Sequence, residues 1–190
     1  MKLILVIFAL LIMGNAAAAE PKPILQIDVD ALTNELQVMS GGSGSLDLVW
    51  WIPVEFWEAT LRQSPDITDG QVEQLLSVLK SYSVLGVVQA DISSFGAFHF
   101  YEKDTVMDGL KVQATGPDGV TRTISHTEPS DPDLRLLLDQ MRPVLAQALG
   151  NMGENFYFFP MPAFDEDERR VPSPYEKWTT GVDCVSNDPT

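Results

Sequence analysis

The chain has 190 residues, of which 27 are acidic and 12 are lysine or arginine, so its formal net charge is −15 at pH 7. Such an acidic surface repels nucleic acid and anionic lipid headgroups, and we expect neither as a partner. Hydrophobic residues make up 45% of the chain, which is enough for one domain with a substantial core. We interpret the negative charge mainly as a source of solubility. The alternative is that it attracts a cationic partner or calcium.

Residues 1–19 have the order of a secretory signal peptide. One positive charge precedes the apolar run 3–13, and Ala17 and Ala19 are the small residues of a cleavage site. At about 1.5 Å per residue the run reaches roughly 17 Å, which is short of the roughly 30 Å core of a bilayer. We therefore expect a cleaved signal peptide and a mature chain, 20–190, that is periplasmic or extracellular without stable membrane insertion. A retained anchor is the alternative.

The chain has one cysteine, Cys184, so no internal disulfide can form and the core alone must hold the fold. No motif around Cys184 is of a kind that activates a thiol, and we assign it no catalytic role. No internal repeat or long linker divides residues 20–190. The sequence thus predicts a single domain that ends in a polar C-terminal tail from about residue 165.

The first part of the mature chain predicts two strands and a short helix. Apolar and polar residues alternate over 24–30, which is typical of an edge strand, and 46–52 has the pattern of a mostly buried strand. The glycine-serine run 41–45 before the second strand predicts a mobile loop. Pro53 suits a first helical position, and apolar residues three and four apart follow it, so we expect a helix from Pro53 to Gln63.

Two longer amphipathic helices are the clearest elements. Thr68 and Gln71 form a capping-box pattern at the start of the first. Asp131 caps the second, Gly150 ends it, and Pro143 predicts a kink or break just before it. The side chains expected in the core are Leu75, Leu76 and Leu79 on the first helix and Leu137, Leu138 and Met141 on the second.

The remaining segments have strand patterns. Apolar runs at 84–92, 95–102 and 154–162 are bounded by turn residues, and a proline-glycine turn at 116–119 joins two strands within 110–125. We therefore expect one α+β domain, with an antiparallel meander of about five to six strands. The two main amphipathic helices and the short helix are expected to pack on one face of this sheet.

The aromatic residues after the glycine-serine run are the candidate ligand- or partner-binding residues. The run itself lacks the lysine of a phosphate-binding loop and the third glycine of a dinucleotide loop. Neighbouring residues of a strand point to opposite faces, so Trp50 and Trp51 can both enter a core only if the sheet is covered on both sides. With one of them exposed, they would form a binding surface with Phe56 and Trp57. In the alternative, all four fill the core or its margin.

Two histidines are candidate general bases. His99 lies in an aromatic strand pattern, which suits a structural histidine, and His126 follows a strand near acidic residues. Neither has a metal-ligand spacing, and no nucleophile motif accompanies them, so we assign no catalytic residue, metal or cofactor. The acidic run 165–168 lacks the alternating ligands and the glycine of an EF-hand loop and has the pattern of a solvated turn.

These features favour a non-enzymatic role. We expect an exported binding or interaction module of the cell envelope, with a protein or a small apolar ligand as its partner. A hydrolase-like enzyme that uses His99 or His126 with a carboxylate is the first alternative, and a structural or assembly protein is the second. An imidazole and carboxylates that converge in a cleft would favour the enzyme, and an open aromatic patch would favour the binding module.

The signal-peptide pattern makes a prediction about processing. When the full chain is expressed and exported, we expect its mature form to begin at or near Glu20, because the small residues before this position suit signal peptidase. Intact mass spectrometry of the exported protein should then give the mass of residues 20–190. A product that pellets with membranes and keeps residues 1–19 would instead support the retained anchor.

Overall fold

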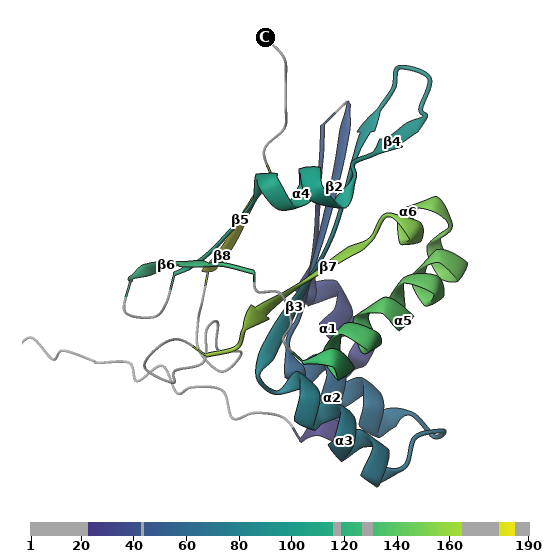
Figure 1. Cartoon of the computed structure of the whole chain (residues 1–190), viewed down its shortest axis with the longest axis vertical. Coiled ribbons are helices and arrows are strands. Elements are labelled where there is room, and N and C mark those ends of the chain that lie inside the picture. Colours follow the sequence, from purple (N-terminus) through teal and green to yellow (C-terminus); the bar gives the residue numbers. More distant parts are fainter. Residues whose placement is uncertain (1–22, 43, 116–118, 127–130, 165–178, 185–190) are drawn as a thin grey trace, which may run out of the picture.

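The computed structural model describes residues 23–42, 44–115, 119–126, 131–164 and 179–184. It confirms the antiparallel α+β class that the sequence predicts, with a main sheet, a second small sheet and several helices (Figure 1). Over the described ranges, no helix is both long enough and apolar enough to cross a membrane.

A five-stranded antiparallel sheet forms the centre of the fold. Its strands are β1 (Gln37–Ser40), β2 (Ser45–Ile52), β3 (Tyr82–Ile92), β4 (Phe98–Phe100) and β7 (Tyr157–Pro162). One edge of β3 pairs with β2, while its other edge is shared by β7, beside residues 82–87, and β4, beside residues 90–92. β3 is enclosed on both edges, and its residues 83–90 are buried without interruption.

A second, three-stranded sheet consists of β5 (Leu110–Thr115), β6 (Thr121–Ile124) and β8 (Thr179–Cys184). β5 lies between β6 and β8 and is antiparallel to both. The hairpin of β5 and β6 is confirmed, and Gly119 takes a φ of 75° before β6, a conformation that glycine adopts without strain. The sequence did not predict β8, because its residues mix threonines with glycine and aspartate and show no clean alternation.

Helices cover one face of the main sheet (Figure 1). They are α1 (Val29–Leu36), α2 (Val54–Gln63), α3 (Asp69–Leu79) and α5 (Pro132–Leu149), with the single turn α6 (Asn151–Glu154) directly after α5. The even-numbered side chains of β2 and β3 point toward these helices. The buried residues of this first core are Leu48, Ile52, Phe56, Leu79, Val84, Val88, Leu134, Leu138, Phe156 and Phe158.

The opposite face of the main sheet is covered by α4 (Lys103–Gly109) and by the second sheet (Figure 1). The odd-numbered side chains of β3 and β7 point this way. The buried residues of this second core are Leu85, Val87, Val106, Val112, Tyr157, Phe159 and Met161. The centre of the main sheet, at β3, is therefore buried on both faces, whereas the sequence predicted cover on one face only.

The edge strand predicted over 24–30 is wrong. Ile24–Gln26 forms one turn of 3₁₀ helix, η1, and α1 begins at Val29. The physical reason is a cap: the carboxylate of Asp28 accepts a hydrogen bond from the Ala31 N–H at 3.0 Å, which satisfies one of the free donors at a helix start. Apolar side chains of α1 then pack on the first core, so helical periodicity prevails over the short alternating pattern.

The predicted helices are confirmed, with two differences in detail. The capping box of Thr68 and Gln71 is present, and Asp131 caps α5. α5 runs unbroken through Pro143 to Leu149, so of the predicted kink or break, the break is absent. Of the predicted core leucines, Leu79 and Leu138 are buried, and Leu137 and Met141 pack partly buried against the first core. Leu75 and Leu76 are only partly buried, because α3 packs mainly on α2 and presents a narrow face.

Gly86 allows the helix layer to approach the main sheet closely. It lies in β3 between Trp50 of β2 and Phe158 of β7. A Cβ atom at this position would overlap the ring of Phe156, whose aromatic carbons occupy the space above the glycine. Phe156 is 1% exposed and directly precedes β7, so its ring cannot move aside without displacing the start of that strand.

This contact predicts opposite effects for two glycine-to-alanine changes. Gly86→Ala should lower the free energy of unfolding by about 1–3 kcal/mol, because an extra methyl group overpacks a filled core. Gly70→Ala should leave stability unchanged or raise it by up to about 1 kcal/mol, because Gly70 lies in α3 with no atom in reach of an added Cβ, and alanine favours helix. Urea unfolding of both variants measures this. Equal stabilities for wild type and Gly86→Ala would contradict the packing.

Candidate functional site

The four aromatic residues proposed from the sequence lie in the two cores. Trp50 packs on the helix side of the main sheet, and Trp51 packs on the opposite side beside the second core. Phe56 is 6% exposed, and Trp57 is partly buried against the helix layer. None of the four is exposed, so the expectation of an exposed tryptophan in this stretch is wrong. The reason is the cover on both faces of the sheet, which gives each side of β2 its own core.

The aromatic side chains of the helix layer contact one another edge to face. The ring centroids of Trp50 and Phe56 are 5.3 Å apart at 85°, and those of Phe56 and Trp57 are 6.1 Å apart at 77°. Such contacts contribute about 0.5–1.5 kcal/mol beyond the burial of area. The indole N–H groups of Trp50 and Trp57 are buried without a hydrogen-bond acceptor. The ring contacts stabilise the core, whereas each buried indole N–H without an acceptor opposes this in part.

The exposed aromatic residues near the glycine-serine loop come from another part of the chain. The loop contacts the end of β3, where the Ile92 N–H donates to the Gly44 carbonyl at 2.8 Å. In the turn that follows β3, Phe95 is 97% exposed, and Phe98 at the start of β4 is 48% exposed. Gly96 closes this turn with a φ of 80°. These phenylalanines are not among the binding residues predicted from the sequence.

His99 lies on an open surface. It is exposed on β4, and its cross-strand neighbour is Asp91 of β3, which in turn lies opposite Ser45 of β2. This order places the carboxylate between the hydroxyl and the imidazole, whereas a catalytic triad needs the imidazole in the middle. Asp91 instead accepts a hydrogen bond from the Tyr101 hydroxyl at 2.9 Å. That bond, with burial and the charges of Asp91 and Asp47, raises the pKa of Tyr101.

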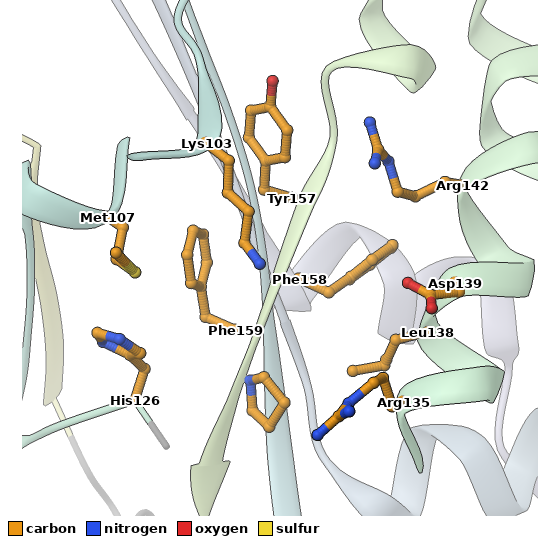
Figure 2. A pocket seen from close by; sticks show the side chains of 11 residues that line it. Lys103, Met107, His126, Arg135, Leu138, Asp139, Arg142, Tyr157, Phe158 and Phe159 are labelled. Atoms are coloured by element: carbon orange, nitrogen blue, oxygen red, sulfur yellow. The ribbon is translucent and has the colours of Figure 1, made fainter. Parts of the chain in front are cut away.

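A cleft of about 200 Å³ follows the outer edge of β7 and is referred to below as the β7 cleft (Figure 2). Its floor is the strand itself, and α5 forms one wall. Lys103 and Met107 of α4 form the other wall together with His126, which lies just after β6. The side chains that line the cleft are Lys103, Met107, His126, Arg135, Leu138, Asp139, Arg142, Tyr157, Phe158, Phe159 and Pro160.

The floor of the β7 cleft is apolar and its rim is charged. The floor residues Tyr157, Phe158, Phe159 and Pro160 are buried, as is Leu138 beside them, whereas the lysine, the two arginines and Asp139 are exposed. Figure 2 shows Lys103 and Arg135 reaching toward the floor from opposite walls. The lining residues within the described ranges include three permanent cations and one carboxylate, in a chain that carries a net charge of −15.

Arg142 and Tyr157 hold each other in place at one end of the cleft. The guanidinium carbon of Arg142 lies 5.6 Å from the centroid of the Tyr157 ring, and its Nη2 donates to the Glu154 carbonyl at 2.9 Å. Burial, followed by the charge of Glu102, raises the pKa of Tyr157, and the positive charge of Arg142 partly opposes this shift. The phenol is therefore neutral at physiological pH, and its hydroxyl donates to the Asn155 Oδ1 at 3.4 Å.

His126 lies in the β7 cleft, and no described residue of the cleft is placed to act as its catalytic partner. Its ring contacts Phe159 with centroids 6.0 Å apart at 71°. Asp139 is on the opposite wall, and Figure 2 shows the aromatic floor between the two side chains. A general base must lie within hydrogen-bond reach of the group that it deprotonates. The His126 imidazole and the Asp139 carboxylate therefore line one cavity but lie on opposite walls, separated by the aromatic floor, and do not act as a pair.

The outer edge of β7 presents few backbone donors. The Ala163 N–H donates to the Ser81 carbonyl on the β3 side, so strand alternation turns residues 158, 160 and 162 outward. Two of these are prolines, which have no N–H, and a proline on an edge strand disfavours pairing with a further strand. Phe158 is left as the position whose N–H faces the cleft.

Two further sequence expectations concern metals and thiols. Among the residues that the structure describes, no group of three His, Cys, Asp or Glu side chains could hold a metal ion. The acidic run 165–168 lies outside the described residues. The backbone of Cys184 ends β8, opposite Leu110 of β5.

Comparison with known proteins adds no assignment: no protein-family model, curated protein or solved structure matches the chain.

The β7 cleft has no continuous sequence signal because its lining residues are dispersed along the chain. α4 was not predicted, so Lys103 and Met107 had no expected position. On α5, Arg135, Asp139 and Arg142 recur at four and three residues, which places them on one face of the helix. That spacing is the one local signal available, and it does not identify β7 as the facing strand.

The position of the tryptophans makes a prediction that uses Phe95 as its control. Trp50→Ala and Trp51→Ala should each lower the free energy of unfolding by about 3–5 kcal/mol, because each truncation leaves a cavity in one of the two cores. Phe95→Ala should change it by less than about 0.5 kcal/mol, because this side chain contacts solvent. Thermal and urea unfolding of the three variants provide the test. A Trp51→Ala variant as stable as wild type would mean that Trp51 does not pack under the second sheet.

Proposed function

We propose that the chain is a non-enzymatic binding domain, exported to the cell envelope, whose ligand site is the β7 cleft. The observation that carries this proposal is a buried aromatic floor beneath an open rim of polar groups. Small-molecule sites are concave and mostly apolar, with a few polar groups that orient the ligand. Export rests on the signal-peptide pattern of residues 1–19.

The dimensions of the cleft favour a small molecule over a protein segment. Its volume of about 200 Å³ compares with the roughly 150 Å³ of a protein cavity that holds benzene, and it is below the roughly 300–1,000 Å³ of typical drug-sized pockets. The prolines of β7 also disfavour a peptide that would extend the sheet. A ligand of about one ring with a polar substituent suits this space.

The arrangement of the histidines supports binding over catalysis. His99 lies on an exposed strand outside the cleft, and His126 contacts an aromatic ring with its carboxylate neighbour on the other wall. The alternative function is a hydrolase-like enzyme that uses His126, since this residue lines the same cleft as Asp139. The following experiment separates the two.

A thermal-shift screen of small molecules tests the proposed site. A ligand at about 100 times its dissociation constant stabilises the folded state by roughly 2.7 kcal/mol, which should raise the melting temperature by about 5 °C or more. We expect at least one compound to do this for wild type and to lose the effect in Met107→Trp, which fills one wall of the cleft. Met39→Trp, a change on the exposed strand β1, should keep the full shift. Each shift is measured against the ligand-free melting temperature of the same variant.

Two outcomes would contradict the proposal. A compound that stabilises Met107→Trp as much as wild type binds elsewhere, and if every stabilising compound behaves so, the cleft is not the site. Hydrolysis of a nitrophenyl ester by wild type that is lost in His126→Ala would favour the enzyme instead.

A further inference from the structure

The charge of the β7 cleft is opposite to that of the chain. Lys103, Arg135 and Arg142 face one cavity, and Asp139 is the one carboxylate among the lining residues that the structure describes. The whole chain has 12 lysine and arginine residues against 27 acidic ones. Cations in such a chain have carboxylates available for pairing at most places on the surface. The grouping of three cationic side chains in one concave site is therefore not explained by solubility alone.

Lys103 and Arg142 are not used in ion pairs within the described part of the chain. Arg62, by contrast, forms ion pairs with Glu58 and Glu73. Arg142 contacts the Tyr157 ring and the Glu154 carbonyl, neither of which carries a full negative charge. These contacts fix the guanidinium in position and leave its other N–H groups available. A planar, oriented guanidinium is suited to bind a carboxylate or phosphate.

The position of Lys103 is unfavourable for local helix stability. It is the first residue of α4, where the partial positive charge of the helix N-terminus favours acidic side chains and disfavours a cation. Figure 2 shows its side chain extending along the floor, with the ammonium group beside Phe158 and Phe159. A lysine in this place contributes to the cavity and not to the helix.

An uncharged donor completes the site. Strand alternation turns the Phe158 N–H toward the cleft. An anion in the cleft would thus meet fixed cations on both walls and a backbone donor from the floor. The apolar part of a ligand would contact the rings of Phe158 and Phe159, which line the same space.

We infer that the β7 cleft binds a small organic anion, with one carboxylate or phosphate group on an apolar body of about single-ring size. The anionic group contacts Lys103 and Arg142, and the apolar body lies on the aromatic floor. This inference rests on the proposed function, since it assigns a ligand class to the same cleft.

Titration calorimetry with a matched set of single-ring probes tests the ligand class. The probes are benzoate, phenyl phosphate, the neutral benzyl alcohol, the cationic benzylamine and inorganic phosphate. We expect benzoate or phenyl phosphate to bind, and whichever of the two binds more tightly identifies the anionic group. Benzyl alcohol and benzylamine should bind at least about tenfold more weakly, because a hydrogen bond to a charged group is worth about one factor of ten or more in affinity.

The variants separate the cations from the general charge of the protein. Lys103→Gln and Arg142→Gln should each weaken binding of the preferred anion about tenfold, and Arg142→Lys should restore part of the loss because it keeps the charge. Lys80→Gln removes an exposed lysine at the end of α3, outside the cleft lining, and should leave the affinity unchanged. The amide resonance of Phe158 should shift on addition of the anion to wild type.

Each of the other possible results contradicts one part of the inference: the anionic group, the apolar body of the ligand, or the cleft as a binding site. If benzyl alcohol binds as tightly as benzoate and Lys103→Gln has no effect, the ligand need not be an anion. The cleft would still be a binding site. Inorganic phosphate binding as tightly as phenyl phosphate would overturn the apolar body. If no anion binds at millimolar concentration while the thermal-shift screen finds a neutral ligand that Met107→Trp excludes, the anionic class is wrong and the proposed function stands. If that screen finds no ligand either, both are wrong.

Discussion

The missing side chain of Gly86 determines how the helix layer meets the sheet. Because the Phe156 ring occupies the space that a Cβ atom would take, the end of α6 and the start of β7 are held against the middle of β3. A second close approach follows on the same segment, where a Cβ at Gly153 would overlap the Leu145 carbonyl of α5. These two contacts place α5 beside the edge of β7, and that spacing creates one wall and the floor of the cleft.

The cover on both faces of the main sheet explains why an aromatic-rich stretch is structural. In a sheet with one solvated face, the alternation of side chains would have exposed either Trp50 or Trp51. Here each face has its own core, and successive residues of β7 are divided in the same way between the two cores. The strand edge is then the one part of β7 that neither core covers, which is where the cleft lies.

Local patterns predicted much of the fold from the sequence, and tertiary contacts decided the rest. The capping box of Thr68 and Gln71 and the cap at Asp131 depend on neighbouring residues, and both are present. The segment 24–30 was misassigned because six alternating residues are too few to exclude a capped helix. The cleft was not predictable, because its lining residues come from separate parts of the chain, among them Lys103, His126 and Arg142. They lie together only when β3 pairs with β7 and the second sheet covers the face of the main sheet opposite the helices.

In the proposed anion site, the acidity of the chain and the cations of the cleft act over different distances. At physiological ionic strength the screening length is about 8 Å, so distant carboxylates contribute little once a ligand is in contact with the cleft cations. During approach, however, the net charge of −15 repels an anion in proportion to its own charge. A singly charged ligand meets less of this repulsion than a polyanion. The same charge distribution that attracts a small anion at short range therefore selects against nucleic acids and other polyanions.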